Sequence, residues 1–308
     1  MISKVTLHTG PLRVASRSLG RFLTAQKATL AQQGVVYLPE IDVAGAFAEG
    51  TPAKQLAEAI KAGAGEAQHV VLLAPGVPVV EAAGYLKALA EELPLTVIRA
   101  LRRQDDALES WLLSGAAACP PLEEILQEPE RILPWLNHAR DVGALVQALG
   151  ASALRLVVYD RLPRGPVAAY CELMGLPDTL CVEAAPTLNT RLSAPMAALL
   201  VQLQSEKLSC DKRSLLADVF ARLSREEARA AVLLSASQRA ALLERFADGN
   251  ASLAREWFGT EQLFQSAMPA QDTPVSRLEL PENSAAFLQE VIGPMMLKLS
   301  EGSYLGKR

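Results

Sequence analysis

Short apolar segments alternate with helix-like segments through the first half of the chain, and this alternation limits the possible folds. The apolar segments show almost no polar alternation, which is typical of parallel strands buried on both faces of a sheet. Their repetition with helices predicts an α/β domain with a doubly wound, mainly parallel sheet and helices on both faces. The expected strands are Val5–His8, Val35–Leu38, Val70–Ala74, Leu95–Leu101 and Leu154–Tyr159, and the helices after them extend to Gln33 and over Pro52–Ala64, Val79–Glu92, Asp105–Ala117 and Pro166–Met174.

Helical patterns replace the alternation from about Thr190 onward. We therefore divide the chain into an α/β core over residues 1–189 and a helical extension over residues 190–308 that packs on the core. Capping-box spacings and glycines mark where its helices are expected to begin and end. These signals are Ser224 with Glu227, Ser235 with Gln238, Gly249 and Gly259.

The composition is that of a folded protein with no general attraction to polyanions. The 308 residues are 50% hydrophobic and 21% charged, which suits one large α/β domain with a helical extension. Thirty Lys plus Arg residues against thirty-four Asp plus Glu give a net charge of −4, so neither nucleic acid nor an anionic membrane is an expected partner. Any basic site must be local.

The cysteine and histidine content argues against a metal site. The four cysteines form no C-x-x-C pair, and the three histidines lie at no metal-ligand spacing. The sequence contains no apolar run long enough for a signal peptide or a membrane span. We expect a cytoplasmic protein with reduced thiols, whereas export would instead allow a bridge between Cys171 and Cys181.

The loop after His8 has the residues of an anion site. A strand that turns sharply into a helix directs unpaired backbone N–H groups and the positive end of the helix dipole at one point. An arginine in the first helical turn is repelled by that dipole unless an anion is present. Arg13, Ser16, Arg17 and Ser18 therefore predict a phosphate-like ligand at the carboxyl end of the first strand, where ligands of such sheets bind.

Two other interpretations of this loop follow from its residues. Arg13, Arg17 and Arg21 recur every four residues, so they would also suit a solvated basic helix face. The loop is a poor nucleoside-triphosphate P-loop, because the Gly-x4-Gly-Lys-Ser/Thr pattern would need its second glycine at Ala15 and its lysine at Ser16.

The loop resembles the 5'-phosphosulfate loop of the sulfotransferase family, particularly its bacterial branch. There, Leu-His-Ile-Gly is followed by two variable residues, by Lys-Thr-Gly-Thr-Thr-Ser and by a helix with Arg-Phe-Leu. Here Arg13 occupies the position of the family's lysine, and Arg17 occupies that of the second threonine. Val14 replaces a hydroxyl residue, and Ala15 replaces the glycine. The matching residues are Leu7, His8, Gly10, Ser18, Leu19, Arg21, Phe22 and Leu23.

A second cluster follows the strand Leu95–Leu101. The run Arg102-Arg103-Gln104-Asp105-Asp106 resembles a run that the bacterial branch often carries, and Ser110 is expected about two turns into the next helix. A guanidinium and a hydroxyl together can clamp a phosphate. In the family, an arginine and a serine at this spacing hold the 3'-phosphate of the sulfonate donor, phosphoadenosine phosphosulfate, which implies that role for Arg102 and Ser110.

The alternative for this cluster is a helix cap. Acidic residues at a helix start commonly pair with nearby arginines. Arg102 and Arg103 would then simply pair with Asp105, Asp106 or Glu109.

The resemblance implies an enzyme that transfers a sulfuryl group from phosphoadenosine phosphosulfate to a hydroxyl of a small molecule or glycan. Arg13 would place a cation over the leaving phosphate. Glu40 and Asp42 follow the second strand at roughly the distance from Arg13 at which glycan sulfotransferases place their carboxylate base. His8 is a weaker candidate for the base, because it would serve only if it points out of the strand end.

Two other functions remain open from the sequence. Ala15 in place of glycine, and Ala74-Pro75-Gly76 where the bacterial branch often has Ser-Glu, favour a catalytically inactive binding or scaffold protein that retains a nucleotide pocket. Transfer from a different nucleotide donor is the other possibility. The acceptor cannot be read from the sequence, because variable loops form acceptor pockets.

Overall fold

The computed structural model divides the chain into two compact units, and each is described by itself. The first comprises Met1–Ala107, Glu128–Leu188 and Leu242–Ala267, and the second comprises Leu108–Gln127, Asn189–Ala241 and Met268–Arg308. The predicted boundary at residue 190 stays a prediction. The structure describes residues 2–115, 120–177, 192–204, 216–217, 219–220, 232–280 and 284.

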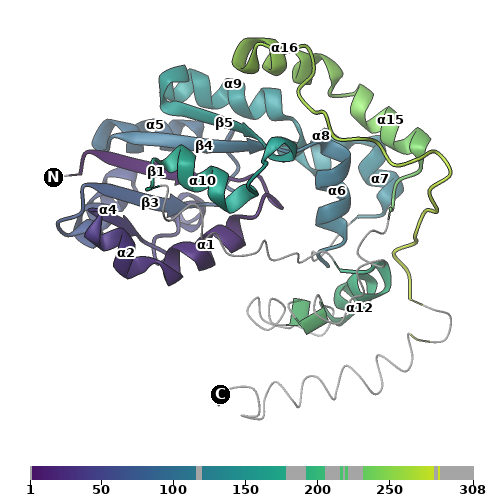
Figure 1. Cartoon of the computed structure of the whole chain (residues 1–308), viewed down its shortest axis with the longest axis horizontal. Helices are drawn as coiled ribbons and strands as arrows, with labels where there is room; N and C mark the ends of the chain where they lie inside the picture. The colour runs from purple at the N-terminus through teal and green to yellow at the C-terminus, as the bar shows by residue number, and fades with distance from the viewer. Residues whose placement is uncertain are drawn as a thin grey trace. The chain divides into compact units, whose positions relative to one another are not determined.

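The first unit contains a sheet of five parallel strands in the order β2-β3-β1-β4-β5 (Figure 1). This confirms the predicted α/β fold, and all five predicted strands are present. The chain leaves β1 toward β2 and leaves β4 toward β5, so the loops after β1 and β4 diverge and create a crevice of the kind that binds ligands. The strands are β1 (Lys4–His8), β2 (Val35–Tyr37), β3 (His69–Leu73), β4 (Leu95–Leu101) and β5 (Leu154–Val158).

Most of the described helices belong to the first unit. They are α1 (Ser16–Ala25), α2 (Lys27–Gln32), α3 (Val43–Ala48), α4 (Ala53–Ala64), α5 (Ala83–Glu92), α8 (Pro129–Ile132), α9 (His138–Leu149), α10 (Pro166–Met174) and α16 (Ala247–Phe258). The second unit contains α7 (Leu122–Gln127) and α12 (Ala194–Gln204). Helices α6 (Gln104–Leu112) and α15 (Ala236–Glu244) each contain residues of both units, and short 3-10 turns cover Pro134–Leu136, Ala151–Ala153 and Tyr159–Arg161.

The sheet is apolar on both faces, as predicted from its strands. Successive residues of a strand point to opposite faces, and the buried residues form two separate apolar clusters. Val70 and Leu72 of β3 belong to the cluster that contains residues of α4, α5 and α9. Val71, which lies between them, belongs to the cluster that contains residues of α1, α2 and α10. Helices therefore cover both faces.

Helix signals in the last third of the chain are partly confirmed. The backbone N–H of Gln238 donates to Ser235 Oγ at 3.2 Å and that of Ser235 to Gln238 Oε1 at 2.9 Å, which is the predicted capping box. Gly259 ends α16 in the left-handed conformation (φ 61°), as expected. The prediction that Gly249 ends a helix is wrong, because it lies inside α16. The capping box of Ser224 and Glu227 lies outside the described residues.

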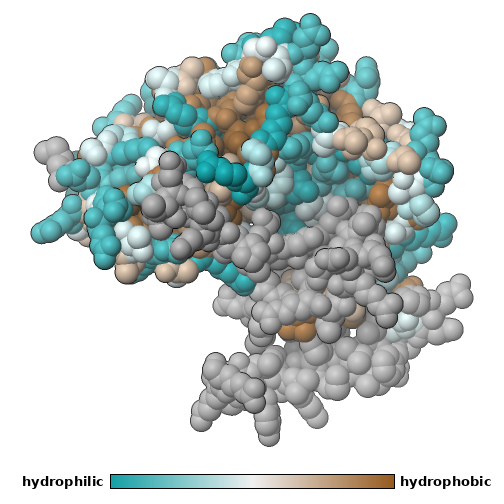
Figure 2. All heavy atoms as spheres, viewed as in Figure 1, coloured by the Kyte–Doolittle hydropathy of each residue, from teal (hydrophilic) through white to brown (hydrophobic). Residues whose placement is uncertain are grey.

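The described residues on the visible face are mainly hydrophilic, with some hydrophobic residues exposed between them (Figure 2). Among the described helices, none is both long and apolar enough to cross a membrane. Within the same residues, no group of three or more His, Cys, Asp or Glu side chains is placed to hold a metal ion. Cys171 is buried in α10, and the other three cysteines lie outside the described residues.

Gly249 remains helical because α16 packs closely on α9. A Cβ atom at Gly249 would lie 2.9 Å from Ala139 Cβ, whereas a Cβ atom at Gly143 of α9 would meet nothing within 4 Å. We expect Gly249→Ala to lower the free energy of unfolding by about 1–3 kcal/mol through overpacking. The matched Gly143→Ala should raise it by about 0.5–1 kcal/mol through helix propensity. Urea denaturation measures both, and equal effects of the two variants would contradict this packing.

Candidate functional site

The loop after β1 begins as an extension of the sheet and touches the loop after β3. The backbone N–H of Thr9 donates to the Ile98 carbonyl at 3.1 Å, and that of Ala100 donates to the Gly10 carbonyl at 3.0 Å. Gly10 has a φ of 86°, and a Cβ atom there would lie 3.3 Å from the backbone nitrogen of Gly76. A glycine is therefore required at Gly10 by both its conformation and the close approach of the second loop.

The start of α1 has an unusual backbone. Ala15 adopts the left-handed conformation (φ 62°), and so does Arg13 (φ 68°). Ala15 is the N-cap residue and makes no side-chain capping bond, and the first turn contains no acidic residue. The first-turn N–H groups thus lack the usual side-chain cap, and the backbone at Ala15 has a geometry that glycine favours.

His8 holds Ser16 from inside the core. His8 is fully buried, and its Nε2 lies 2.9 Å from Ser16 Oγ. Burial, followed by the positive charge of Arg99, lowers the pKa of His8 to about 3. The imidazole is therefore neutral near pH 7, and its ring packs on that of Tyr170 at a centroid distance of 4.6 Å. This is the placement of a structural histidine that positions Ser16.

Arg102 reaches the loop after β1 from the end of β4. Its Nη1 donates to the main-chain carbonyl of Arg13 at 2.5 Å, and its guanidinium lies 5.0 Å from the centre of the Tyr159 ring. Burial raises the pKa of Tyr159, while the positive charges of Arg102 and Arg13 act to lower it. The carboxyl ends of β1, β4 and β5 therefore bring Arg13, Arg102 and Tyr159 together.

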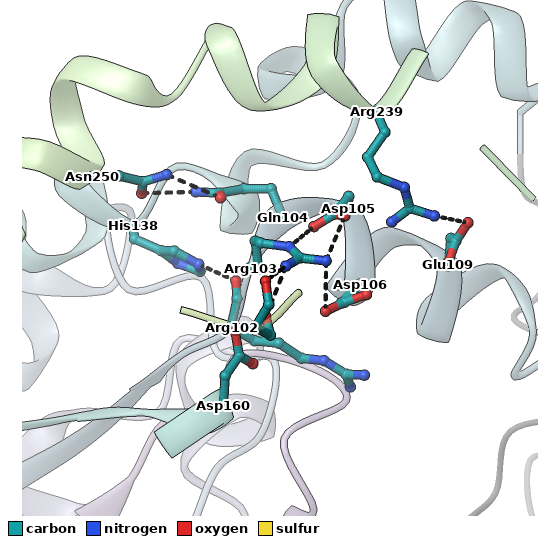
Figure 3. Close-up of polar contacts among 11 residues, drawn as sticks. Arg102, Arg103, Gln104, Asp105, Asp106, Glu109, His138, Asp160, Arg239 and Asn250 are labelled. Atoms are coloured by element: carbon teal, nitrogen blue, oxygen red, sulfur yellow. Dashed lines mark hydrogen bonds and ion pairs between the residues drawn. The ribbon is translucent and has the colours of Figure 1, made fainter. Parts of the chain in front are cut away.

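Arg103 forms the helix cap that was the alternative interpretation of this cluster (Figure 3). Its Nε and Nη2 donate to the Asp105 carboxylate at 2.7 and 3.0 Å, and Nη2 lies 3.3 Å from Asp106 Oδ2. Its Nη1 donates to both the carbonyl and the hydroxyl oxygen of Ser266, at 2.6 and 2.8 Å. Ser266 in turn donates to Asp160 at 2.9 Å. Arg103 thus has a structural role.

Ser110 lies in the second unit, whereas Arg102 lies in the first. Ser110 is buried. Its neighbour Glu109 belongs to a buried ion pair with Arg239 at 2.8 Å and also accepts from the backbone N–H of Leu233 and of Leu234. The predicted phosphate clamp of Arg102 and Ser110 stays a prediction.

Arg99 is a buried cation that the sequence analysis missed. Its side chain is 1% exposed, its Nη1 donates to the Thr9 carbonyl at 3.0 Å, and its Nη2 forms an ion pair with Asp141 of α9. Burial lowers the pKa of Arg99, and the Asp141 carboxylate acts in the opposite direction. In the sequence, Arg99 is a single charged residue inside the apolar strand Leu95–Leu101, which indicates a buried cation. This pattern does not identify Asp141 as the partner of Arg99.

The two carboxylates after β2 are both exposed. Asp42 caps α3, because its side chain accepts from the backbone N–H of Gly45 at 2.9 Å. Burial raises the pKa of the Tyr37 phenol, and the negative charge of Glu40 raises it further. The assignment of either residue as a base stays a prediction, and Glu40 is the one whose charge reaches Tyr37.

The remaining loop residues lie on two sides of α1. Ser18 is buried, whereas Arg17 is exposed. Ser16 and Arg17 line an open cavity of about 620 Å³ that also includes Tyr37. The structure therefore places Ser16 at the junction of the candidate anion loop and this cavity.

Comparison with known proteins gives one similar solved structure. No model of a known protein family matches the chain, and no curated protein matches it. A structure described as a sulfotransferase from Alicyclobacillus acidocaldarius matches with 13% sequence identity and a TM-score of 0.38, over 74% of this chain and 98% of that chain. The fold assignment therefore rests on the sheet itself.

Two buried histidines, His8 and His138, and the partly buried His69 predict that acid destabilises the protein. Burial lowers the pKa of His8 to about 3 and those of His69 and His138 to about 4, from an ordinary value of 6.5. Below pH 6.5 the unfolded chain binds protons that the folded chain does not, so the free energy of unfolding falls as pH falls. Each imidazole contributes up to about 1.4 kcal/mol per pH unit.

Urea denaturation between about pH 7 and pH 5 measures this dependence. The raised pKa values of Asp106 and Asp141 act in the opposite direction, because the folded chain retains carboxyl protons that the unfolded chain has lost. His69→Gln should make the slope of the free energy of unfolding against pH shallower. The reduction should correspond to at most one proton fewer bound on unfolding. A free energy of unfolding that does not change over this range would contradict the burial of the histidines.

Proposed function

We propose that this chain binds phosphoadenosine phosphosulfate beyond the carboxyl ends of β1 and β4 and transfers its sulfuryl group to a hydroxyl of a small molecule or glycan. The observation that carries the proposal is the hydrogen bond from Arg102 to the Arg13 carbonyl. It joins two segments 89 residues apart, each of which resembles a donor-binding motif of the sulfotransferase family. Both segments border the crevice that the sheet order creates.

The groups in this crevice suit a donor with several phosphates. Arg102 uses one Nη atom on a neutral carbonyl, so its charge is retained, and a guanidinium offers further N–H donors. Arg13 adds a second cation near Tyr159. In the proposal, the first turn of α1 with Ser16, Arg17 and Ser18 holds the phosphosulfate, and Arg102 holds the 3'-phosphate.

The transfer needs a base for the acceptor, and we assign this role to Glu40. The acceptor oxygen attacks the sulfur atom as the bond from sulfur to the bridging phosphate oxygen breaks, and Glu40 takes the hydroxyl proton. The products are a sulfate ester and phosphoadenosine phosphate, whose new negative charge Arg13 stabilises. Asp42 is a less suitable base than Glu40, because its carboxylate already caps α3.

A second candidate function is binding of the nucleotide without transfer. Two observations favour it: Glu40 and Asp42 are both exposed, and Ala15 carries a side chain at a left-handed position where the family has glycine. A protein of this kind would retain the crevice and its arginines but lack a base aligned with the donor. The two predictions below separate these functions.

Phosphoadenosine phosphate, the product of the donor, should bind, and Arg102→Ala should weaken its binding. Loss of a charged phosphate partner is expected to cost at least about 2 kcal/mol, or roughly a 30-fold loss of affinity. The free energy of unfolding should fall by only about 1 kcal/mol, because one hydrogen bond to a carbonyl is lost. Isothermal titration and urea denaturation measure the two quantities.

The matched control for this prediction is Arg164→Ala. Arg164 is an exposed arginine that pairs with Glu172 of α10, so its removal changes the net charge equally without touching the crevice. The Arg164→Ala variant should bind phosphoadenosine phosphate with the same affinity as the unmodified chain. Absence of heat and of a thermal shift at millimolar ligand would exclude the donor site.

Glu40→Gln tests the assignment of the base. It should abolish release of phosphoadenosine phosphate from phosphoadenosine phosphosulfate in the presence of hydroxyl acceptors, while the product still binds. Asp42→Asn should retain most of the activity, because asparagine is also a good N-cap residue. If the unmodified chain binds the nucleotide but releases no product with any acceptor, the binding function replaces the enzymatic one.

A further inference from the structure

Two side chains from distant parts of the chain hold the loop after β1 by its carbonyl oxygens. Arg102 Nη1 donates to the Arg13 carbonyl at 2.5 Å, and the hydroxyl of Tyr170, in α10, donates to the Val14 carbonyl at 2.8 Å. Tyr170 and Val14 are both fully buried in the same apolar cluster. The Val14 carbonyl therefore points into the core.

The N–H groups of the same two peptides point the opposite way. Both peptide bonds are trans, so the carbonyl of one residue and the N–H of the next lie on opposite sides of the C–N bond. Because the Val14 carbonyl is turned toward Tyr170, the Ala15 N–H is directed away from the core. The Arg13 carbonyl orients the Val14 N–H in the same manner. Neither N–H donates to any other residue that the structure describes.

The backbone around these N–H groups has the form of an anion-binding nest. Arg13 and Ala15 are left-handed, and Val14 between them is not. An alternation of this kind turns successive N–H groups toward one concave side, where an anion can bind. Ser16 begins α1, so its N–H also precedes the first helical hydrogen bond. The loop thus presents three successive N–H donors, those of Val14, Ala15 and Ser16.

Tyr170 supports this loop at a second point through its ring. The ring packs on that of His8 at a centroid distance of 4.6 Å, and His8 Nε2 lies 2.9 Å from Ser16 Oγ. Burial raises the pKa of Tyr170 well above its ordinary value of 10, so its hydroxyl keeps its proton and remains a donor. One side chain of α10 therefore fixes both the backbone of the loop, at Val14, and the side chain of Ser16.

We propose that Tyr170 is a positioning residue for an anion of the phosphate or sulfate class bound by the backbone of the loop after β1. Tyr170 acts through the Val14 carbonyl, which it holds inward so that the Ala15 N–H stays directed at the anion. Identifying this anion as the phosphosulfate of the donor rests on the proposed function. Without the hydroxyl, the Val14 carbonyl loses its buried donor, and nothing holds that peptide in the orientation that binds the anion.

Tyr170→Phe tests the role of the hydroxyl, because it keeps the ring that packs on His8. Isothermal titration should show about a tenfold loss of affinity for phosphoadenosine phosphate, whose 5'-phosphate would occupy the loop. Inorganic pyrophosphate, a probe without a nucleoside, should show the same loss. The affinity for adenosine 3'-phosphate, which lacks the 5'-phosphate, should not change. A general loss of stability would not distinguish between these probes.

The matched control is Tyr85→Phe. The Tyr85 hydroxyl is buried without a hydrogen-bond partner among the described residues, and its ring packs on that of Phe47 at a centroid distance of 5.8 Å. Tyr85 contacts the other apolar cluster, which contains residues of α4, α5 and α9. This variant should bind all three probes as the unmodified chain does, and melting curves check that both variants fold.

A measurement on the unmodified chain does not depend on any variant. The amide resonances of Val14, Ala15 and Ser16 should shift when pyrophosphate is added, because their N–H groups would donate to the anion. Amide resonances that do not move at millimolar pyrophosphate would contradict the nest, and with it the role of Tyr170.

The outcomes separate this inference from the proposed function. Unchanged affinities of Tyr170→Phe, an equal loss for adenosine 3'-phosphate, equal effects of Tyr170→Phe and Tyr85→Phe, or no binding of any probe would each overturn the inference. If pyrophosphate binding depends on Tyr170 while the adenine nucleotides do not bind, the inference is correct and the donor site is wrong. If phosphoadenosine phosphate binds Tyr170→Phe and the unmodified chain equally, the donor site is correct and the inference is wrong.

Discussion

The buried guanidinium of Arg99 is the interaction on which the rest of the candidate site depends. An unpaired cation inside a sheet core is very unfavourable, so Arg99 must keep both Asp141 and the Thr9 carbonyl. Through Asp141 it joins β4 to α9, and through Thr9 it fixes where the loop after β1 leaves the sheet. A loop conformation that moved the Thr9 carbonyl would leave a buried donor without its acceptor. The loop is therefore ordered in advance of any ligand, which reduces the entropy lost on binding.

Two adjacent arginines at the end of β4 have opposite roles. Arg103 is surrounded by the carboxylates of Asp105 and Asp106 and by Ser266, so its charge is used within the protein. Arg102 contacts a carbonyl oxygen and an aromatic ring, and neither of these cancels its charge. The Arg-Arg-Gln-Asp-Asp run thus combines a rigid cap with a cation that remains available at the crevice. The rigid cap supports the cation, because it fixes the backbone on which Arg102 stands.

The sequence predicted the elements better than it predicted the contacts between them. All five strands could be found because apolar runs of that length are local features, and the box of Ser235 and Gln238 depends on only four residues. The low helix propensity of glycine predicts that Gly249 ends a helix. This is wrong, because Gly249 lies inside α16 and faces Ala139 of another helix. The partner of Arg99 is 42 residues away. No local pattern could identify it, because that pairing exists only once α9 packs on the sheet.

The first turns of α1 contain several features that the fold alone does not require. Ala15 and Arg13 hold left-handed conformations, which cost roughly 1–2 kcal/mol each for residues other than glycine. Gly20 weakens the helix interior. The apolar packing of Leu19, Phe22 and Leu23 would hold this helix equally well without any of them. Unfavourable local choices that gather at one place, while the surrounding core is well packed, are typical of a binding site. In this chain they gather where the candidate donor loop and the cavity share the same helical turn.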